Sequence, residues 1–178
     1  MKDVEIIALM TDQIEVALVA ASYNYLIVQS NQPTQQGTPT QSTIFFHKLF
    51  EIPYGFPATT QIFNSVNQIL TETTEQLYES HWQISALVNQ VPGDTTTPTA
   101  SDVVNYIQLW LSSRTNLRTF VTNGMGMFRI RRSENQYFDN DKSQYQAMPN
   151  FEIIFSHKNS VSSSIPFVTT VDGKSYVI

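Results

Sequence analysis

The chain has 178 residues and a formal net charge of -5, and 41% of its residues are hydrophobic. That length favours one domain with a core large enough to fold alone, and that hydrophobic share excludes a disordered chain. The acidic balance argues against general nucleic-acid binding. The absence of cysteine excludes disulfides, cysteine-ligated zinc and thiol nucleophiles.

Charged residues make up only 14% of the chain, against a usual share of about 25%. The surface must therefore be rich in Gln, Asn, Thr and Ser, which suits extended protein contacts because such groups cost less to desolvate. No apolar run reaches about 18 residues, so we expect no transmembrane helix. The first residues lack the apolar block of a signal peptide, so we expect the protein to stay in the cytoplasm where it is made.

The first third of the chain predicts one helix and two strands. Apolar residues at helical spacing predict an amphipathic helix over 3–22. A short strand follows at 25–28, then a polar loop at 31–41 and a strand rich in β-formers at 43–50. The segment 62–70 fits either a weak helical face or a protruding hairpin arm.

Strict alternation over 75–88 predicts a long, half-buried strand, because Tyr78, Trp82, Ile84, Ala86 and Val88 share one face. A helix begins at Thr99 or Ser101 and ends near Arg114 and Arg118. Gly124-Met125-Gly126 indicates a turn or bulge that lets two backbones approach. Strands are expected near 125–133 and 148–158, joined by a polar loop at 134–146.

This order of elements predicts an α+β fold, in which a mostly antiparallel β-sheet carries two main helices packed on one face. We assign one domain to residues 1–160. Asp172-Gly173 favours a tight turn, so residues 161–178 are expected to form a C-terminal hairpin or arm.

All five arginines lie in one stretch that contains no acidic residue: Arg114, Arg118, Arg129, Arg131 and Arg132. The planar guanidinium group of arginine can bind a carboxylate or another anion at two points. We therefore expect this stretch to bind a distant part of the chain, another subunit or a ligand. The acids proposed for it are Glu72, Glu75 and Glu79, across a seam between subunits. Arg129 and Arg131 share one strand face and Arg132 lies on the other.

Patterns for catalysis or metal binding are weak. Asp139-Asn140-Asp141 resembles the start of a calcium loop, but the required Gly and terminal acid are missing. His47, His81 and His157 could meet if their strands pair, yet no acidic ligand pair accompanies them. No nucleophile elbow or carboxylate pair stands out. We therefore expect no enzymatic activity, cofactor or metal.

Four segments resemble the phage neck or tail terminator family in their local sequence and in the order of their elements. They are Asn31-Gln32-Pro33 with Phe45-Phe46-His47-Lys48, the strand Glu75–Ile84, Ala100–Val104 and Gly126–Ile130. The likeness spans roughly 30–160. It implies a compact fold whose copies form rings, commonly hexamers, that close the head-proximal end of the tail tube and meet the neck of the capsid. Genomic DNA would pass through the channel without specific binding.

The resemblance predicts a structural virion protein at the head–tail junction, assembled in the host cytoplasm, whose partners are itself, the tail tube and the head connector. Two alternatives stay open. One is another virion component of similar fold, such as a tail completion or tail tube protein. The other is a nucleic-acid-binding module that uses the arginine strand, with Tyr137 and Phe138 as stacking groups.

Overall fold

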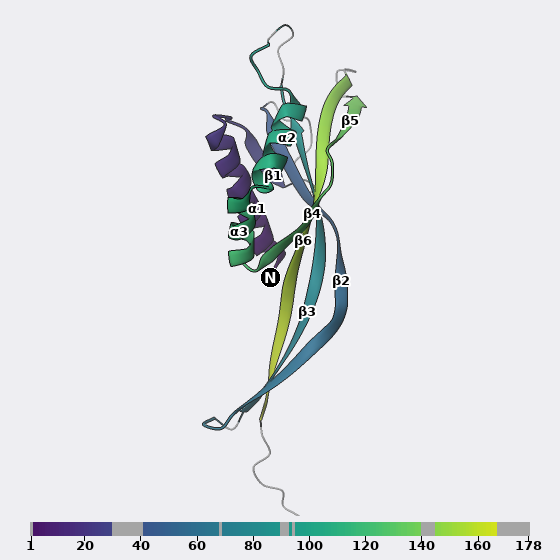
Figure 1. The fold of residues 1–178 in the computed structure, drawn as a ribbon. Helices are drawn as coiled ribbons and strands as arrows, with labels where there is room; N and C mark the ends of the chain where they lie inside the picture. Colours follow the sequence, from purple (N-terminus) through teal and green to yellow (C-terminus); the bar gives the residue numbers. More distant parts are fainter. Residues whose placement is uncertain are drawn as a thin grey trace, which may run out of the picture.

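The computed structural model describes residues 2–29, 41–67, 69–89, 93, 95–139 and 145–166. Figure 1 shows a helical body above a long, bare extension of the sheet. The elements in chain order are α1 (Asp3–Ala20), β1 (Leu26–Gln29), β2 (Thr43–Asn64), β3 (Ile69–Leu87), α2 (Ala100–Leu111), α3 (Arg114–Thr122), β4 (Met125–Ile130), β5 (Glu134–Asp139) and β6 (Tyr145–Pro166).

The six strands form one mixed sheet in the order β1-β2-β3-β6-β4, and β5 pairs with the first part of β6. Only β1 and β2 run parallel among these pairs; the others are antiparallel. The predicted α+β class and mostly antiparallel sheet are therefore confirmed. The described chain has three helices where two main helices were expected.

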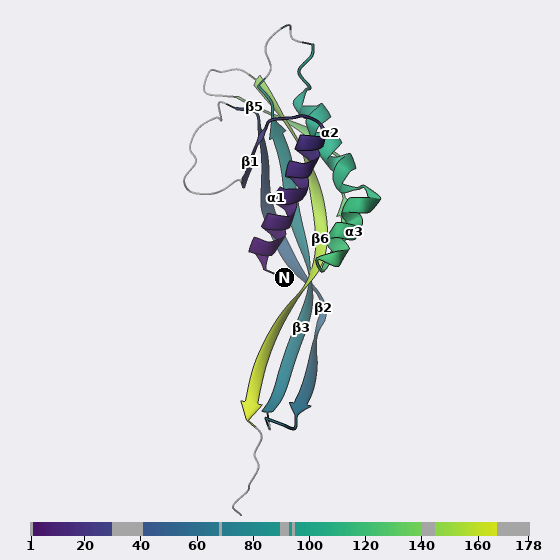
Figure 2. The ribbon, with the colours of Figure 1, turned by 90° about the vertical axis from the view of Figure 1, so that its left-hand side faces the viewer.

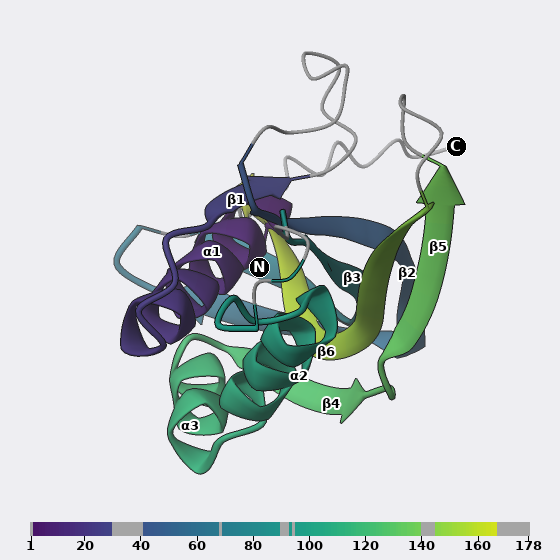
Figure 3. The same cartoon turned by 90° about the horizontal axis from the view of Figure 1, so that it is seen from above.

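The helices cover one face of the upper sheet (Figures 2 and 3). Alternation decides which strand residues meet them: Trp82, Ile84 and Ala86 of β3 are buried among the helices, as the period-two pattern predicted. From the helices, Ile14 of α1 and Ile107 of α2 complete this core. The core is confined to the upper half of the molecule.

The predicted single helix after Thr99 is interrupted at Ser112 and Ser113. Ser112 Oγ donates to the Gln108 carbonyl (2.7 Å), and Ser113 Oγ accepts from the Asn116 backbone N–H (3.4 Å). Serine side chains that bond the backbone in this way favour helix ends and caps. Arg114 consequently begins α3 instead of lying near the end of α2, which corrects the expected position of Arg114 and Arg118.

The two glycines after α3 lie at a turn and at a contact with the neighbouring strand. Gly124 has φ +79, a left-handed conformation that suits the end of a helix. At Gly126, a Cβ would lie 2.6 Å from Ser156 Oγ on the paired strand β6, so the glycine leaves room for the Ser156 side chain. This turn brings β4 back against the sheet beside α3.

Three strands run far beyond the helices, and all are longer than predicted. We define the arm as residues 52–64 of β2, 69–79 of β3 and 158–166 of β6, which stay paired to the tip, with one register shift between Tyr54 and Ala58 of β2. The helical interpretation of 62–70 is wrong and the hairpin alternative is correct. Many Thr residues favour strand here, and Pro53 and Pro57 are tolerated because β2 is an edge strand below β1.

The predicted polar loop at 134–146 is also wrong in part, because β5 occupies 134–139 and β6 already begins at 145. A polar strand at the sheet edge gives little alternation to recognise. Residues 140–141 of the segment that resembles a calcium loop, and the expected hairpin around Asp172-Gly173, lie outside the described residues. Residues 161–166 of the expected C-terminal arm belong to β6.

Candidate functional site

The arm exposes apolar side chains on strands that no described helix covers. Phe63, Leu70 and Ile165 stand side by side in register on three adjacent strands near the tip. Phe56 is 97% exposed and Val66, in the tip turn, is 88% exposed. The arm edges of β2 and β6 face no further described strand. Apolar patches and open strand edges of this kind mark protein-contact surfaces.

The three acids singled out from the sequence all lie on β3 within the arm. Glu75 bonds Lys158 Nζ at 3.2 Å, and Gln61 Nε2 donates to Glu72 at 2.7 Å. Among the described residues, Glu72 and Glu79 form no ion pair. The arm therefore presents uncompensated carboxylates beside its apolar side chains.

The five arginines lie on the body and divide into two groups. Arg114 and Arg118 are one helical turn apart on α3, exposed to solvent. On and after β4, Arg131 binds Glu152 of β6 at 2.7 Å, and Arg132 lies 3.8 Å from Glu134. No described carboxylate pairs with Arg114, Arg118 or Arg129. These three guanidinium groups remain available to another molecule.

The strand pairing places Arg129 opposite Ile154, while the Arg131 backbone N–H donates to the Glu152 carbonyl. Ile154 and Glu152 are two residues apart on one strand, so the two arginines share the sheet face away from the helices. Arg131 is thus already paired within the chain. The sequence gives no hint of this, because Glu152 is distant and lies in an apolar run.

The arm acids and the body arginines do not meet in one molecule. Figure 1 shows the arm projecting away from the body that carries α3 and β4. The described arm contributes no salt-bridge partner to any of the five arginines. A contact between Glu72 or Glu79 and these arginines consequently requires a second copy.

A polar network holds the root of the arm. Lys48 Nζ binds Asp3 of α1 at 2.7 Å and Glu51 of β2 at 2.9 Å. Glu51 Oε1 also accepts from Ser80 Oγ (2.9 Å) and contacts His157 Nε2 (2.8 Å). This network ties the first turn of α1 to the point where all three arm strands leave the body.

Burial and hydrogen bonding set the charge states of the network. Burial favours raising the pKa of the Glu51 carboxyl, but hydrogen bonds from Lys48 and Ser80 outweigh it and lower that pKa below 4.5. Burial lowers the pKa of His157 below 6.5, despite the nearby Glu51. At neutral pH the network therefore contains a carboxylate, an ammonium and a neutral imidazole.

Ser80, His157 and Glu51 do not have the arrangement of a catalytic triad. The hydroxyl and the carboxylate both contact the same imidazole nitrogen, Nε2, whereas a triad places them on opposite nitrogens. Nδ1 is buried without a hydrogen-bond partner among the described atoms, and Ser80 is fully buried. We interpret the cluster as structural.

The three histidines do not converge. His81 faces away from the helices, where its Nδ1 contacts Glu152 and Phe50 stacks on its ring, while His157 faces the helix side. Within the described ranges, no group of three metal-ligating side chains is present. Nor is any described helix long and apolar enough to cross a membrane.

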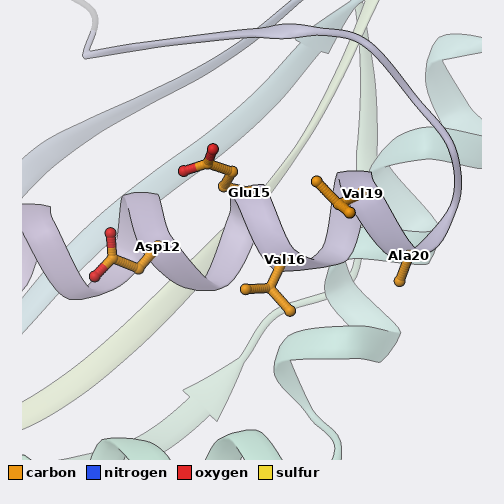
Figure 4. A pocket seen from close by; sticks show the side chains of 5 residues that line it. All are labelled: Asp12, Glu15, Val16, Val19 and Ala20. Atoms are coloured by element: carbon orange, nitrogen blue, oxygen red, sulfur yellow. The ribbon is translucent and has the colours of Figure 1, made fainter.

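The outward face of α1 was missed by the sequence reasoning. Opposite the buried stripe, α1 exposes Val16 (50%) and Val19 (70%), which line a shallow apolar hollow with Asp12, Glu15 and Ala20 (Figure 4). The signal was available, since apolar residues lie on both sides of this helix. A helix that is apolar all round is normally buried on all sides.

Comparisons with known proteins point in one direction. The family model described as E217 gateway protein gp29 matches residues 5–167. The chain is also similar to a structure solved by cryo-electron microscopy, the sheath/tube terminator of the extracellular contractile injection system PVC in its extended state. That likeness has a TM-score of 0.52 at 10% identity and covers 100% of this chain and 63% of that chain. No curated protein matches the sequence.

The family match spans nearly the whole chain, and the chain therefore belongs to the E217 gateway protein gp29 family. The likeness to the sheath/tube terminator is one of fold, and this chain spans less than two thirds of that protein. The predicted resemblance to phage tail terminators is thereby confirmed.

Proposed function

We propose that this chain is a ring-forming subunit at the head–tail junction of a tailed phage, where it caps the tail tube and joins it to the head connector. A gateway family and a terminator-like fold support a structural role in the tail. The observation that carries the proposal is the arm: a three-stranded extension of the sheet that no described helix covers and that exposes apolar side chains such as Phe56 and Val66.

A ring of identical subunits explains why one molecule carries acidic and basic patches on different surfaces. Head-to-tail contacts join one patch to a different patch on the next copy, and they form closed rings where the rotation closes. This molecule has acidic, apolar patches on α1 and the arm and unpaired arginines on α3 and β4. Each type of patch would repel a copy of itself and attract the other type.

The arm is proposed to reach outside the chain's own body, toward the tail tube or a neighbouring subunit. Glu72 and Glu79 are the acids without an ion pair within the described chain, and Arg129 is the free cation on the sheet face away from the helices. We propose that these groups meet between copies. The apolar side chains of the tip would bind the tail tube.

Genomic DNA is proposed to pass through the ring channel without specific binding. The net charge of -5 supports this, because a channel that attracted DNA strongly would delay its passage. We propose no catalytic or cofactor role.

Two measurements test this function. Size-exclusion chromatography with light scattering should give a discrete oligomer, either alone or after mixing with tail tubes. Electron micrographs of labelled particles should place the subunit at the end of the tail nearest the head. Labelling along the whole tail would instead indicate a tube protein, and a monomer absent from particles would refute the proposal.

A further inference from the structure

We infer that the ring closes through its helical layer: the outward face of α1 in one copy binds the outward face of α3 in the next. This inference deepens the proposed function and rests on it, because it names the two faces that form the seam. The second copy is the partner on grounds of charge, apolar content and position.

The α1 face combines apolar and acidic side chains. Ala8, Asp12, Glu15 and Val19 recur at i, i+4, i+7 and i+11, so they form one stripe. All four are exposed, and the stripe lies opposite the buried Ile6, Met10 and Ile14. Neither carboxylate of this stripe takes part in an ion pair with the described residues. Figure 4 shows the neighbouring Val16 and Val19 beside the acids.

The α3 face has the same form with the opposite charge. Arg114, Arg118 and Val121 recur at i, i+4 and i+7, and they lie opposite the buried Asn116 and Phe120. Val121 is 66% exposed, and α3 contains no acidic residue. Two cations and an apolar side chain thus face outward with no described partner.

Arg114 adds an independent argument for an external anion. It is the first residue of α3, where the helix dipole is positive and disfavours a cation. No acidic residue occupies the first turn to compensate. A carboxylate from another copy would relieve both the unpaired guanidinium and the dipole.

The positions of the two faces favour a ring over a two-fold dimer. In Figure 2, α1 lies on one side of the helical layer and α3 lies on the other, and α2 packs against both. Two α1 faces would place four carboxylates together, and two α3 faces would place four guanidinium groups together. Both self-pairings are repulsive, so only the α1–α3 contact between copies is complementary.

Paired charge reversals test this seam. One variant carries Arg114→Glu and Arg118→Glu, so both of its faces are acidic; the other carries Asp12→Arg and Glu15→Arg, so both are basic. Each variant alone should lose assembly while keeping the wild-type circular dichroism spectrum. An equimolar mixture should regain assembly, because every seam then joins an acidic α1 to a basic α3 or the reverse.

The single change Arg132→Glu is the matched control, since it reverses an exposed charge outside both helices and should leave assembly intact. If Arg114→Glu with Arg118→Glu assembles like the wild type, or if the mixture stays dissociated, the choice of faces is wrong while the ring stands. A wild-type chain that never assembles, even beside tail tubes, overturns the ring itself and the seam with it.

The absence of cysteine permits a direct check of the contact. A variant with Val19→Cys and Val121→Cys should form, on mild oxidation, a disulfide ladder that extends to the size of the ring. Each single cysteine variant should yield no species beyond a dimer. A ladder that stops at dimers in the double variant would refute the α1–α3 seam.

Discussion

His157 shows how a single buried side chain makes this fold sensitive to acid. Its imidazole, on β6, is buried at the root of the arm, with Ser80 and Glu51 on Nε2 and Tyr78 stacked nearby. Because burial lowers its pKa below 6.5, the folded chain resists its protonation. In the unfolded chain the same imidazole is exposed to water and is protonated more readily.

We therefore expect stability to fall as the pH drops from about 7.5 to about 5.5, since the unfolded state takes up a proton in this window and the folded state does not. The variant His157→Gln should flatten this decline, and thermal unfolding at several pH values measures it. Some decline will remain, because burial also lowers the pKa of His47. An equally steep curve in the variant would contradict the assignment.

Glu51 also makes the stability of the fold decrease on acidification, but at a lower pH than His157. Hydrogen bonds hold its pKa below 4.5 against the effect of burial, so its contribution is complete above about pH 4.5 and is lost as the pH falls through the folded pKa. Protonation of His157 and Glu51 should therefore destabilise the polar network at the root of the arm.

Thr99 provides a second test at this scale. Its Oγ1 accepts from the Asp102 backbone N–H at 3.1 Å, and the Asp102 carboxylate accepts from the Thr99 backbone N–H at 3.0 Å. Thr99→Ala should lower the free energy of unfolding by about 1 kcal/mol through loss of this cap. Chemical denaturation would measure the change. Thr99→Ser should retain most of the stability, and an unchanged alanine variant would rule out the cap's contribution.

At the scale of elements, the arm residues that we propose for binding are distinct from the residues that form the core. Its apolar side chains near the tip lie outside the buried core cluster, which is confined to the helix-covered half of the sheet. Substitutions there should therefore affect binding more than stability.

The variant Phe63→Thr, Leu70→Thr and Ile165→Thr places a strand-forming, β-branched residue at all three sites. We expect it to fold with a thermal midpoint close to that of the wild type and to lose binding to tail tubes in a co-sedimentation assay. Ile84→Thr is the matched control within the core, and it should cost at least about 2 kcal/mol. Tube binding by the triple variant at wild-type levels would exclude the tip as a contact.

Elements with strong alternation could be predicted from the sequence, and the others could not. The 75–88 pattern identified the core face of β3 correctly, because burial on one side imposes a period of two. The arm has no such pattern: with neither face covered by a helix, Thr, Ser and apolar residues occur on both sides. Its length was therefore underestimated on all three strands.

The same reasoning explains what was missed at the candidate site. The arginine stretch was recognised, but sequence could not show that Arg131 already pairs with Glu152 or that Ser112 and Ser113 divide the helix. The α1 face was overlooked because the buried stripe accounts for a helix by itself. Only the fold shows that its second apolar side is uncovered.

At the scale of the whole molecule, the structure consists of a packed body and a bare arm. The body holds the core and presents two complementary helical faces, and the arm extends the same sheet beyond it (Figure 1). The proposed function gives this shape a setting at the junction of head and tail. In the proposed ring, contacts between α1 and α3 would join neighbouring subunits, and the arms would extend toward the tail tube or a neighbouring subunit.

Cryo-electron microscopy of the purified chain mixed with tail tubes tests the ring most directly. We predict closed rings of identical subunits at one end of each tube, with the Asp12 stripe of one copy against the Arg118 stripe of the next. Tubes with bare ends beside free monomers would contradict the account.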